Sequence, residues 1–289
     1  MKKIAWSMSV LLVLSLHGAL AAGTALQQQD SECSRLLDAK DYAQARPVCS
    51  ASAEGGDAAD QFHLSMMYAM GWGVAKDKTA SLEWLQASAN QGYPPAEYAL
   101  SSRLAADASV PRDREEAQRL LVHAAEHGFL LAQILLGHAY EAGFPDVGIG
   151  KDMPRAVHWY RQAAAQCESC QYELWRIYYF GRGVDKDYTM AASHLIKAAE
   201  AGLPKAQMHL AFLYHDGEGV PKDAVKAYMW FFIAAKGGDP AARKALPLMA
   251  KKISRSQAAE ARAMADKVME RTINMAQLCA VYQQFCKSR

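Results

Sequence analysis

The feature that most constrains this chain is an aspartate that returns at a nearly constant spacing. Five times a Lys-Asp or Arg-Asp pair precedes a segment with helical patterning, at Asp77, Asp113, Asp152, Asp187 and Asp223. The successive spacings are 36, 39, 35 and 36 residues. Repeats of about 20 to 50 residues are typical of solenoids and arrays. The sequence therefore predicts a repeat protein whose core is built from one neighbour contact after another.

Other positions keep the same period. A glycine follows the second half of most units, at Gly56, Gly92, Gly128, Gly202 and Gly238, and one such glycine is missing between 128 and 202. A leucine also recurs with a Tyr or Leu four residues later, which marks the buried face of a helix. These leucines are Leu64, Leu100, Leu136, Leu174 and Leu210. Each unit is therefore interpreted as a pair of helices.

The turn between the two helices of a unit carries its own signal. Three units contain Gly-x-Gly-Val, beginning at Gly71, Gly181 and Gly217, and glycine supplies the positive φ that ends a helix. The aspartate that follows predicts an N-cap for the second helix, which needs no metal or catalytic role. The first helices are expected to start at Asp60, Ala96, Ala132, Cys170 and Ala206.

The unit at 206–238 carries the full pattern, with Leu210, Tyr214, Gly217-x-Gly219, Lys222-Asp223 and Ala234-Ala235. This pattern resembles the Sel1-like repeat family, and the similarity covers residues 41–240. The resemblance implies an all-α fold, a right-handed α/α superhelical solenoid of about five tetratricopeptide-like helix pairs with capping helices at both ends. It also implies a protein that binds other proteins.

Three units depart from the pattern. Residues 107–110 read Asp-Ala-Ser-Val where Gly-x-Gly-Val is expected, and extra residues occur around 144–149. Trp175 replaces the small residue expected after Leu174.

The ends of the chain predict an exported protein. Residues 1–21 have the basic start, apolar run and small-residue site of a secretory signal peptide, which predicts a periplasmic or secreted protein.

Residues 22–57 are expected to form a capping hairpin, and 58–240 the repeats, at about 60–95, 96–131, 132–169, 170–205 and 206–240. Residues 241–289 are expected to hold capping helices, one of them opened by a capping box at Ser254 to Gln257 and running to about Met269. The sequence leaves open whether 272–289 form a further helix or a tail, and Pro47 predicts a short or kinked helix in the cap.

The charge excludes some partners. The full chain carries +2, and removal of Lys2 and Lys3 with the uncharged residues 4–21 brings this to 0. A neutral mature chain argues against nucleic acid or an anionic membrane as the partner.

The six cysteines fall into three local pairs, which are disulfide candidates in an exported chain. The pairs are Cys33 with Cys49, Cys167 with Cys170, and Cys279 with Cys286. On an unbroken helix the last two would lie about 10 Å apart, beyond disulfide reach, so either the tail bends or these cysteines pair elsewhere. Cys167-x-x-Cys170 at a helix start also permits thiol-disulfide exchange, although thioredoxin-like enzymes carry this motif on a β-α unit.

Catalytic motifs are weak. His123-Ala-Ala-Glu-His127 matches the His-x-x-Glu-His of inverted zinc peptidases, but its central residues belong to the repeat pattern. We therefore expect no catalytic residue, metal or cofactor. Cysteine-rich members of the resembled family imply a β-lactam-binding or hydrolysing enzyme as one alternative, and thiol exchange is the other. The leading hypothesis is a non-enzymatic module that holds a protein or peptide in a concave groove.

The candidate groove residues follow from helical geometry. Counted from the first residue of each unit, positions +2, +6 and +9 share one side of the first helix. The resemblance to tetratricopeptide-type helix pairs assigns this side to the groove. Aromatic and Arg side chains dominate interface energetics. The selected residues are His138, Glu141, Tyr172, Arg176, Tyr179, Met208, Phe212 and His215.

Overall fold

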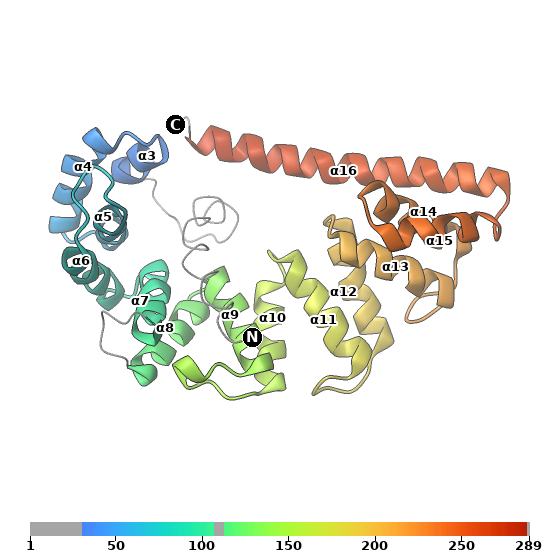
Figure 1. The fold of residues 1–289 in the computed structure, drawn as a ribbon, viewed down its shortest axis with the longest axis horizontal. Coiled ribbons are helices and arrows are strands. Elements are labelled where there is room, and N and C mark those ends of the chain that lie inside the picture. The colour runs from blue at the N-terminus through green and yellow to red at the C-terminus, as the bar shows by residue number, and fades with distance from the viewer. Residues whose placement is uncertain (1–30, 107–112, 288–289) are drawn as a thin grey trace. The chain divides into compact units, whose positions relative to one another are not determined.

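The computed structural model describes residues 31–106 and 113–287, with residues 273–287 described by their backbone alone. It is all-α over these residues, apart from one isolated antiparallel bridge between Phe144 and Ile149. The chain divides into two compact units, residues 1–151 with 283–289, and residues 152–282 (Figure 1). Among the residues with described structure, none of the helices combines the length and apolar character needed to cross a bilayer.

The first unit is a series of helical hairpins. Each consecutive pair of helices from α3 to α9 packs together, and the short helix η1 lies against α8 and α7. The elements are α3 (Glu32–Asp38), α4 (Tyr42–Glu54), α5 (Ala58–Met70), α6 (Lys78–Asn90), α7 (Pro94–Ala106), α8 (Arg114–Glu126), α9 (Leu130–Ala142) and η1 (Pro145–Val147).

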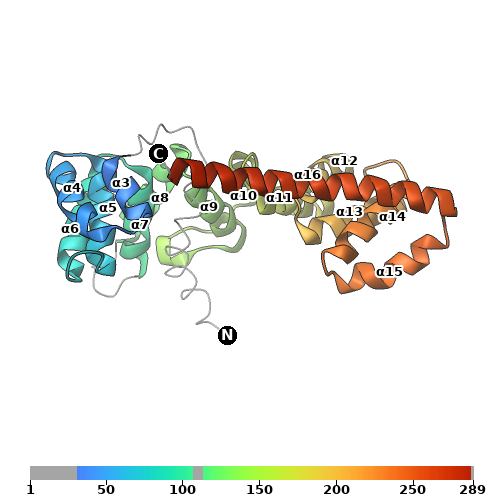
Figure 2. The same ribbon diagram turned by 90° about the horizontal axis from the view of Figure 1, so that it is seen from above.

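The second unit continues the hairpin series. Consecutive helices from α10 to α15 include tightly packed pairs α11 with α12 and α13 with α14. The elements are α10 (Met153–Ala163), α11 (Glu168–Phe180), α12 (Tyr188–Glu200), α13 (Pro204–Asp216), α14 (Ala224–Lys236), α15 (Pro240–Ala250) and α16 (Arg255–Lys287). Figure 2 shows α15 and α16 diverging from the turn that joins them. The Arg262 guanidinium of α16 donates to the Tyr228 hydroxyl of α14 at 3.0 Å.

The five aspartates cap the second helices as the sequence predicts. Each carboxylate accepts a hydrogen bond from a backbone N–H in the first turn, at 2.8 to 3.0 Å for the shortest bond of each cap. The caps are Asp77 on α6, Asp113 on α8, Asp152 on α10, Asp187 on α12 and Asp223 on α14. The spacing of the aspartates along the sequence is therefore the spacing at which the second helices of the repeats begin.

In four of the five repeats, a buried glutamine ties the hairpin to the one before it by a hydrogen bond. Its side-chain N–H donates to a carbonyl in the last turn, or just past the end, of the preceding second helix, where carbonyls lack helical partners. The bonds run from Gln61 to Ala53, Gln133 to Ala125, Gln171 to Ala164 and Gln207 to Ala199. The remaining unit has Glu97, which pairs instead with His123 Nδ1 at 2.7 Å.

Two expectations about helix ends are wrong. The first helices begin two residues before the expected Asp60, Ala96, Ala132, Cys170 and Ala206, at Ala58, Pro94, Leu130, Glu168 and Pro204. The earlier starts have physical causes, since Asp57 caps α5 and proline suits the first turn of α7 and α13. The cap helix α4 is also not short, because it keeps 13 residues around Pro47, and the alternative of a kink at Pro47 stays a prediction.

The last helix of the described chain, α16, is one long helix. Ser254 and Gln257 form the expected reciprocal capping box, with bonds of 2.9 and 3.1 Å. The helix does not end near Met269 but runs on to Lys287, so 272–287 continue α16. Because the backbone is helical at both Cys279 and Cys286, the alternative of a bend that brings them together is not what forms. The lost Gly-x-Gly-Val at 107–110 and the signal peptide at 1–21 lie outside the described residues.

Candidate binding surface

The structure divides the eight predicted groove residues between the two units. His138 and Glu141 lie on α9 of the first unit, with His138 exposed and Glu141 half-buried. The other six lie on the neighbouring helices α11 and α13 of the second unit. We call these six the α11–α13 stripe: Tyr172, Arg176, Tyr179, Met208, Phe212 and His215. The structure thus brings six of the eight predicted residues onto adjacent helices.

The stripe faces away from the packed side of its helices. Phe212 is 42% exposed, and the other five residues are half-buried. Leu174 and Leu210, on the opposite side of the same helices, are both fully buried. Arg176 is only two residues from Leu174, so the change of environment follows from the 100° step of the helix.

The charged groups of the stripe are paired locally. Arg176 donates to the carboxylate of Glu173 at 2.5 Å, and the Tyr179 hydroxyl donates to Glu218. The bond to Glu218, followed by burial, raises the pKa of Tyr179 to about 12. The His215 ring lies 2.7 Å from Asp216. Apart from the Lys252 ammonium, which lies 2.6 Å from His215 Nε2, the stripe offers mainly rings and aliphatic groups to a partner.

Trp175 forms the centre of an aromatic cluster that the sequence analysis did not select. Its ring lies 4.9 Å from that of Tyr172, 5.6 Å from Tyr179 and 4.6 Å from His209 of α13, measured between centroids. The sequence signal was present, because Trp175 stands where the other units have a small residue. Its neighbours then follow from the i−3 and i+4 positions of α11 and from the contact with α13.

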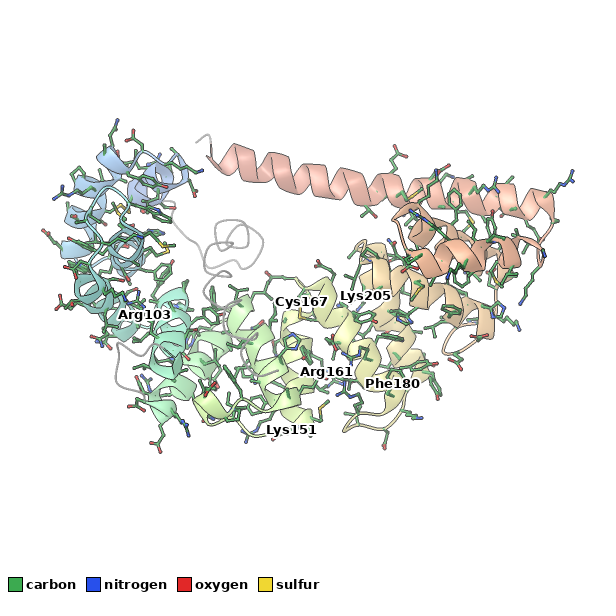
Figure 3. The ribbon with its side chains drawn as sticks, viewed as in Figure 1. Arg103, Lys151, Arg161, Cys167, Phe180 and Lys205 are labelled. Carbon is green, nitrogen blue, oxygen red and sulfur yellow. A yellow bond between two sulfur atoms is a disulfide. The ribbon has the colours of Figure 1, made fainter. Side chains whose placement is uncertain are left out.

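A second group of exposed apolar residues was also missed. Phe180, at the C-terminal end of α11, is 54% exposed, and Tyr188 and Met190 at the start of α12 are exposed as well. Tyr179 joins them to the stripe, with ring centroids 5.0 Å from Phe180 and 5.3 Å from Tyr188. Figure 3 shows Phe180 at the far end of α11 from Cys167. Contiguous exposed apolar side chains mark interaction sites on soluble proteins.

The first two predicted disulfides are present. Cys33 and Cys49 join α3 to α4, and Cys167 and Cys170 close a bridge at the start of α11. Cys167 is also the N-cap of α11, since its sulfur accepts from the Cys170 N–H at 3.1 Å. Both sulfurs of this bridge belong to buried residues, which restricts the access that thiol exchange requires.

The described residues offer no zinc site at His123 and His127. His123 is engaged with Glu97, and His127 Nδ1 lies 2.8 Å from the carbonyl oxygen of His123. The one group of three potential ligands in the described ranges is Cys33, Asp60 and His63. Cys33 is bonded to Cys49 in that group and cannot act as a thiolate.

Comparison with known proteins decides the family. The model of the Sel1 repeat matches five segments, at residues 58–93, 94–129, 130–166, 169–203 and 204–239. The chain belongs to the Sel1 repeat family. Sel1 repeats typically mediate protein–protein interactions and are generally not enzymes.

Two solved structures of Sel1 repeat proteins resemble the chain. One is c5321, a protective antigen present in uropathogenic Escherichia coli strains, with 32% identity and a TM-score of 0.61 over 82% of this chain. This chain spans 52% of c5321, about half its length. The other is a Sel1 repeat protein from Oxalobacter formigenes, with 27% identity and a TM-score of 0.64 over 80% of this chain and 96% of that one.

Proposed function

We propose that this Sel1 repeat protein is a non-enzymatic, exported interaction module that binds a protein or peptide through the α11–α13 stripe. The observation that carries the proposal is Phe212, a large apolar side chain of α13 that is 42% exposed although its ring lies edge-on against the buried Phe231. Aromatic and Arg residues with partly desolvated surroundings are the usual anchors of protein interfaces. The paired charges of the stripe make a partly apolar segment the best-matched partner.

Export is the second part of the proposal. Disulfides persist in oxidising compartments and are rare in the cytosol, and two are formed among the residues whose side chains the structure describes. The leader-like pattern of residues 1–21 supports the same location. Fusion of residues 1–30 to a reporter that is active only outside the cytoplasm tests this part, and an inactive reporter would contradict export.

Site-specific crosslinking tests the binding surface. A photoreactive phenylalanine analogue placed at position 212 should capture a discrete protein when intact cells are irradiated, because the ring would lie within the interface. The same analogue at Leu248 is the matched control, since Leu248 is 58% exposed but lies on α15, outside the stripe. Capture of the same proteins from both positions, or of none from position 212, would contradict the proposal.

A further inference from the structure

The indole N–H of Trp175 is an unpaired buried donor. Trp175 is 4% exposed, and no acceptor among the described residues lies within hydrogen-bonding distance of its Nε1. It is the one buried side-chain nitrogen or oxygen in the described ranges that lacks a partner. Leaving such a donor unsatisfied costs stability, so a native protein that keeps one calls for an explanation.

Trp175 is also out of place as a packing residue. The equivalent positions in the other units hold Ser65, Ser101, Gly137 and Ala211. Two of these show what the position does elsewhere, since the hydroxyls of Ser65 and Ser101 donate to carbonyls of the second helix at 2.8 and 2.6 Å. The indole takes no part in such a bond. It contacts Tyr172 and His209, and Tyr172 belongs to the α11–α13 stripe.

The cover over Trp175 consists partly of side chains that themselves reach solvent. Tyr172, Tyr179 and His209 are half-buried, and Phe180 is exposed. Access to the indole edge requires at least one of these rings to change its rotamer. Side-chain rotamer changes of this kind are common when interfaces form.

The surroundings of the N–H favour a neutral acceptor. Burial lowers the pKa of His209, which keeps its imidazole neutral. The nearest cation of the stripe, Arg176, is already paired with Glu173. A carboxylate or phosphate at the indole would lose its hydration without gaining a counter-charge. The free-energy cost of desolvating a neutral carbonyl oxygen is far lower.

We propose that Trp175 Nε1 donates a hydrogen bond to a carbonyl oxygen of the bound partner, a backbone carbonyl of a segment laid along the α11–α13 stripe. The inference rests on the proposed function and adds a residue that fixes the register of the partner. Tyr172 and His209 flank this bond as an aromatic frame.

The test uses the full chain and N-methylacetamide, a small mimic of the peptide group. Trp175→Phe identifies the indole signal of Trp175 in the ¹H–¹⁵N spectrum by its disappearance. In the wild type, added N-methylacetamide should move that signal downfield, as expected for a newly formed hydrogen bond. The indole of Trp84, which is half-buried and lies in the first unit, is the control and should move less.

An isosteric variant removes the donor without leaving a cavity. Trp175→3-benzothienylalanine replaces the N–H by sulfur. Because the N–H makes no hydrogen bond in the free protein, the substitution breaks none, and the melting temperature of the variant should equal or exceed that of the wild type. Its affinity for a partner captured at position 212 should fall about 3- to 10-fold, the usual worth of one hydrogen bond.

Three results would overturn the inference. One is a Trp175 indole signal that responds no more than that of Trp84. Another is a signal already at a hydrogen-bonded position in the free protein, which would show that water satisfies the donor. The third is a lower melting temperature for the isosteric variant. If the crosslinking experiment fails but the Trp175 signal responds selectively to N-methylacetamide, the proposed function is contradicted. The site for a carbonyl oxygen at Trp175 is then still supported.

Discussion

At the scale of single residues, the second glycine of each Gly-x-Gly turn has a role beyond ending a helix. An added Cβ at Gly219 would overlap the carbonyl oxygen of Tyr188, the first residue of α12 in the preceding hairpin. An added Cβ at Gly183 would overlap the Cβ of Met153, the first residue of α10. The turn of one hairpin therefore rests directly on the helix start of the hairpin before it, at a distance that only glycine permits.

Gly219→Ala tests this contact against a control that isolates backbone strain. Gly56 also has positive φ, but nothing lies near its missing Cβ, so Gly56→Ala should lose only about 1 kcal/mol for the strained φ. Gly219→Ala adds the overlap with Tyr188 and should lose roughly 1 to 3 kcal/mol more. Chemical denaturation measures both. Equal losses would show that the close approach carries no energy.

Glu97 offers a second test at residue scale. It occupies the position of the tying glutamines, is buried, and relies on His123 as its partner. Glu97→Gln can donate to the preceding helix as the other glutamines do, so unfolding free energy should stay equal or rise by up to about 1 kcal/mol. The reverse change, Gln207→Glu, sets a buried carboxylate against the carbonyl of Ala199 and should cost about 1 to 3 kcal/mol. A marked loss in Glu97→Gln would mean that the Glu97–His123 pair itself stabilises the fold.

His194 predicts a pH dependence. Burial, followed by the charges of Lys197 and Arg161, lowers the pKa of His194 from an ordinary value of 6.5 to about 4. Between pH 6.5 and 4, His194 binds a proton in the unfolded chain but not in the folded chain. The free energy of unfolding therefore falls as the pH drops from 6.5 to 4 and keeps its full value above that window. His194→Gln should flatten this decline in denaturation curves at several pH values. His158→Gln, which changes an exposed histidine, should leave it as in the wild type.

At the scale of elements, most of the repeat could be predicted because its signals are local. An aspartate that caps a helix and a glycine that ends one act on backbone groups a few residues away, so the five caps were predicted. The helix starts were placed two residues late, since Pro94 and Pro204 suit a first turn whatever the apolar pattern says. The tying glutamines were missed, because their acceptors lie seven or eight residues upstream across a turn.

The binding surface could be predicted only in part. The side of α11 and α13 that stays open follows from the helical period, which is how Arg176 and Phe212 were selected. The aromatic cluster around Trp175 depends on His209 from another helix, and on a substitution that breaks the repeat pattern. Phe180 could have been selected as well, because Gly181 predicts the end of α11 and places Phe180 in its last turn.

The disulfide of the N-terminal hairpin predicts a local effect. Cys33 and Cys49 are 16 residues apart and fully buried, so Cys33→Ala with Cys49→Ala should lose about 3 kcal/mol. Because each hairpin of a solenoid contacts only its neighbours, hydrogen exchange should rise first in α3 and α4. Cys167→Ser with Cys170→Ala opens a much smaller loop, keeps an N-cap oxygen, and should lose about 1 kcal/mol less. Uniform loss of protection along the chain would contradict the local effect.

At the scale of the whole molecule, the repeats fall into two compact units with a boundary after Lys151. This boundary lies inside the third Sel1 repeat, between its first helix α9 and its second helix α10. The extra residues noted in the sequence around 144–149 lie just before it, and form η1 with a bridge between Phe144 and Ile149. The departure from the repeat period therefore marks the division of the chain.

One side of α11 packs into the fold, and we propose that the other side binds a partner. Melting and binding measured on the same variants separate the two roles. Leu174→Ala should cost about 2 to 5 kcal/mol of stability by leaving a cavity in the packed side. Arg176→Ala and Phe212→Ala should each weaken binding of the protein captured at position 212 by about 1 to 3 kcal/mol while the melting temperature stays near that of the wild type. Equal loss of stability from Arg176→Ala and Leu174→Ala, with binding unchanged, would contradict the account.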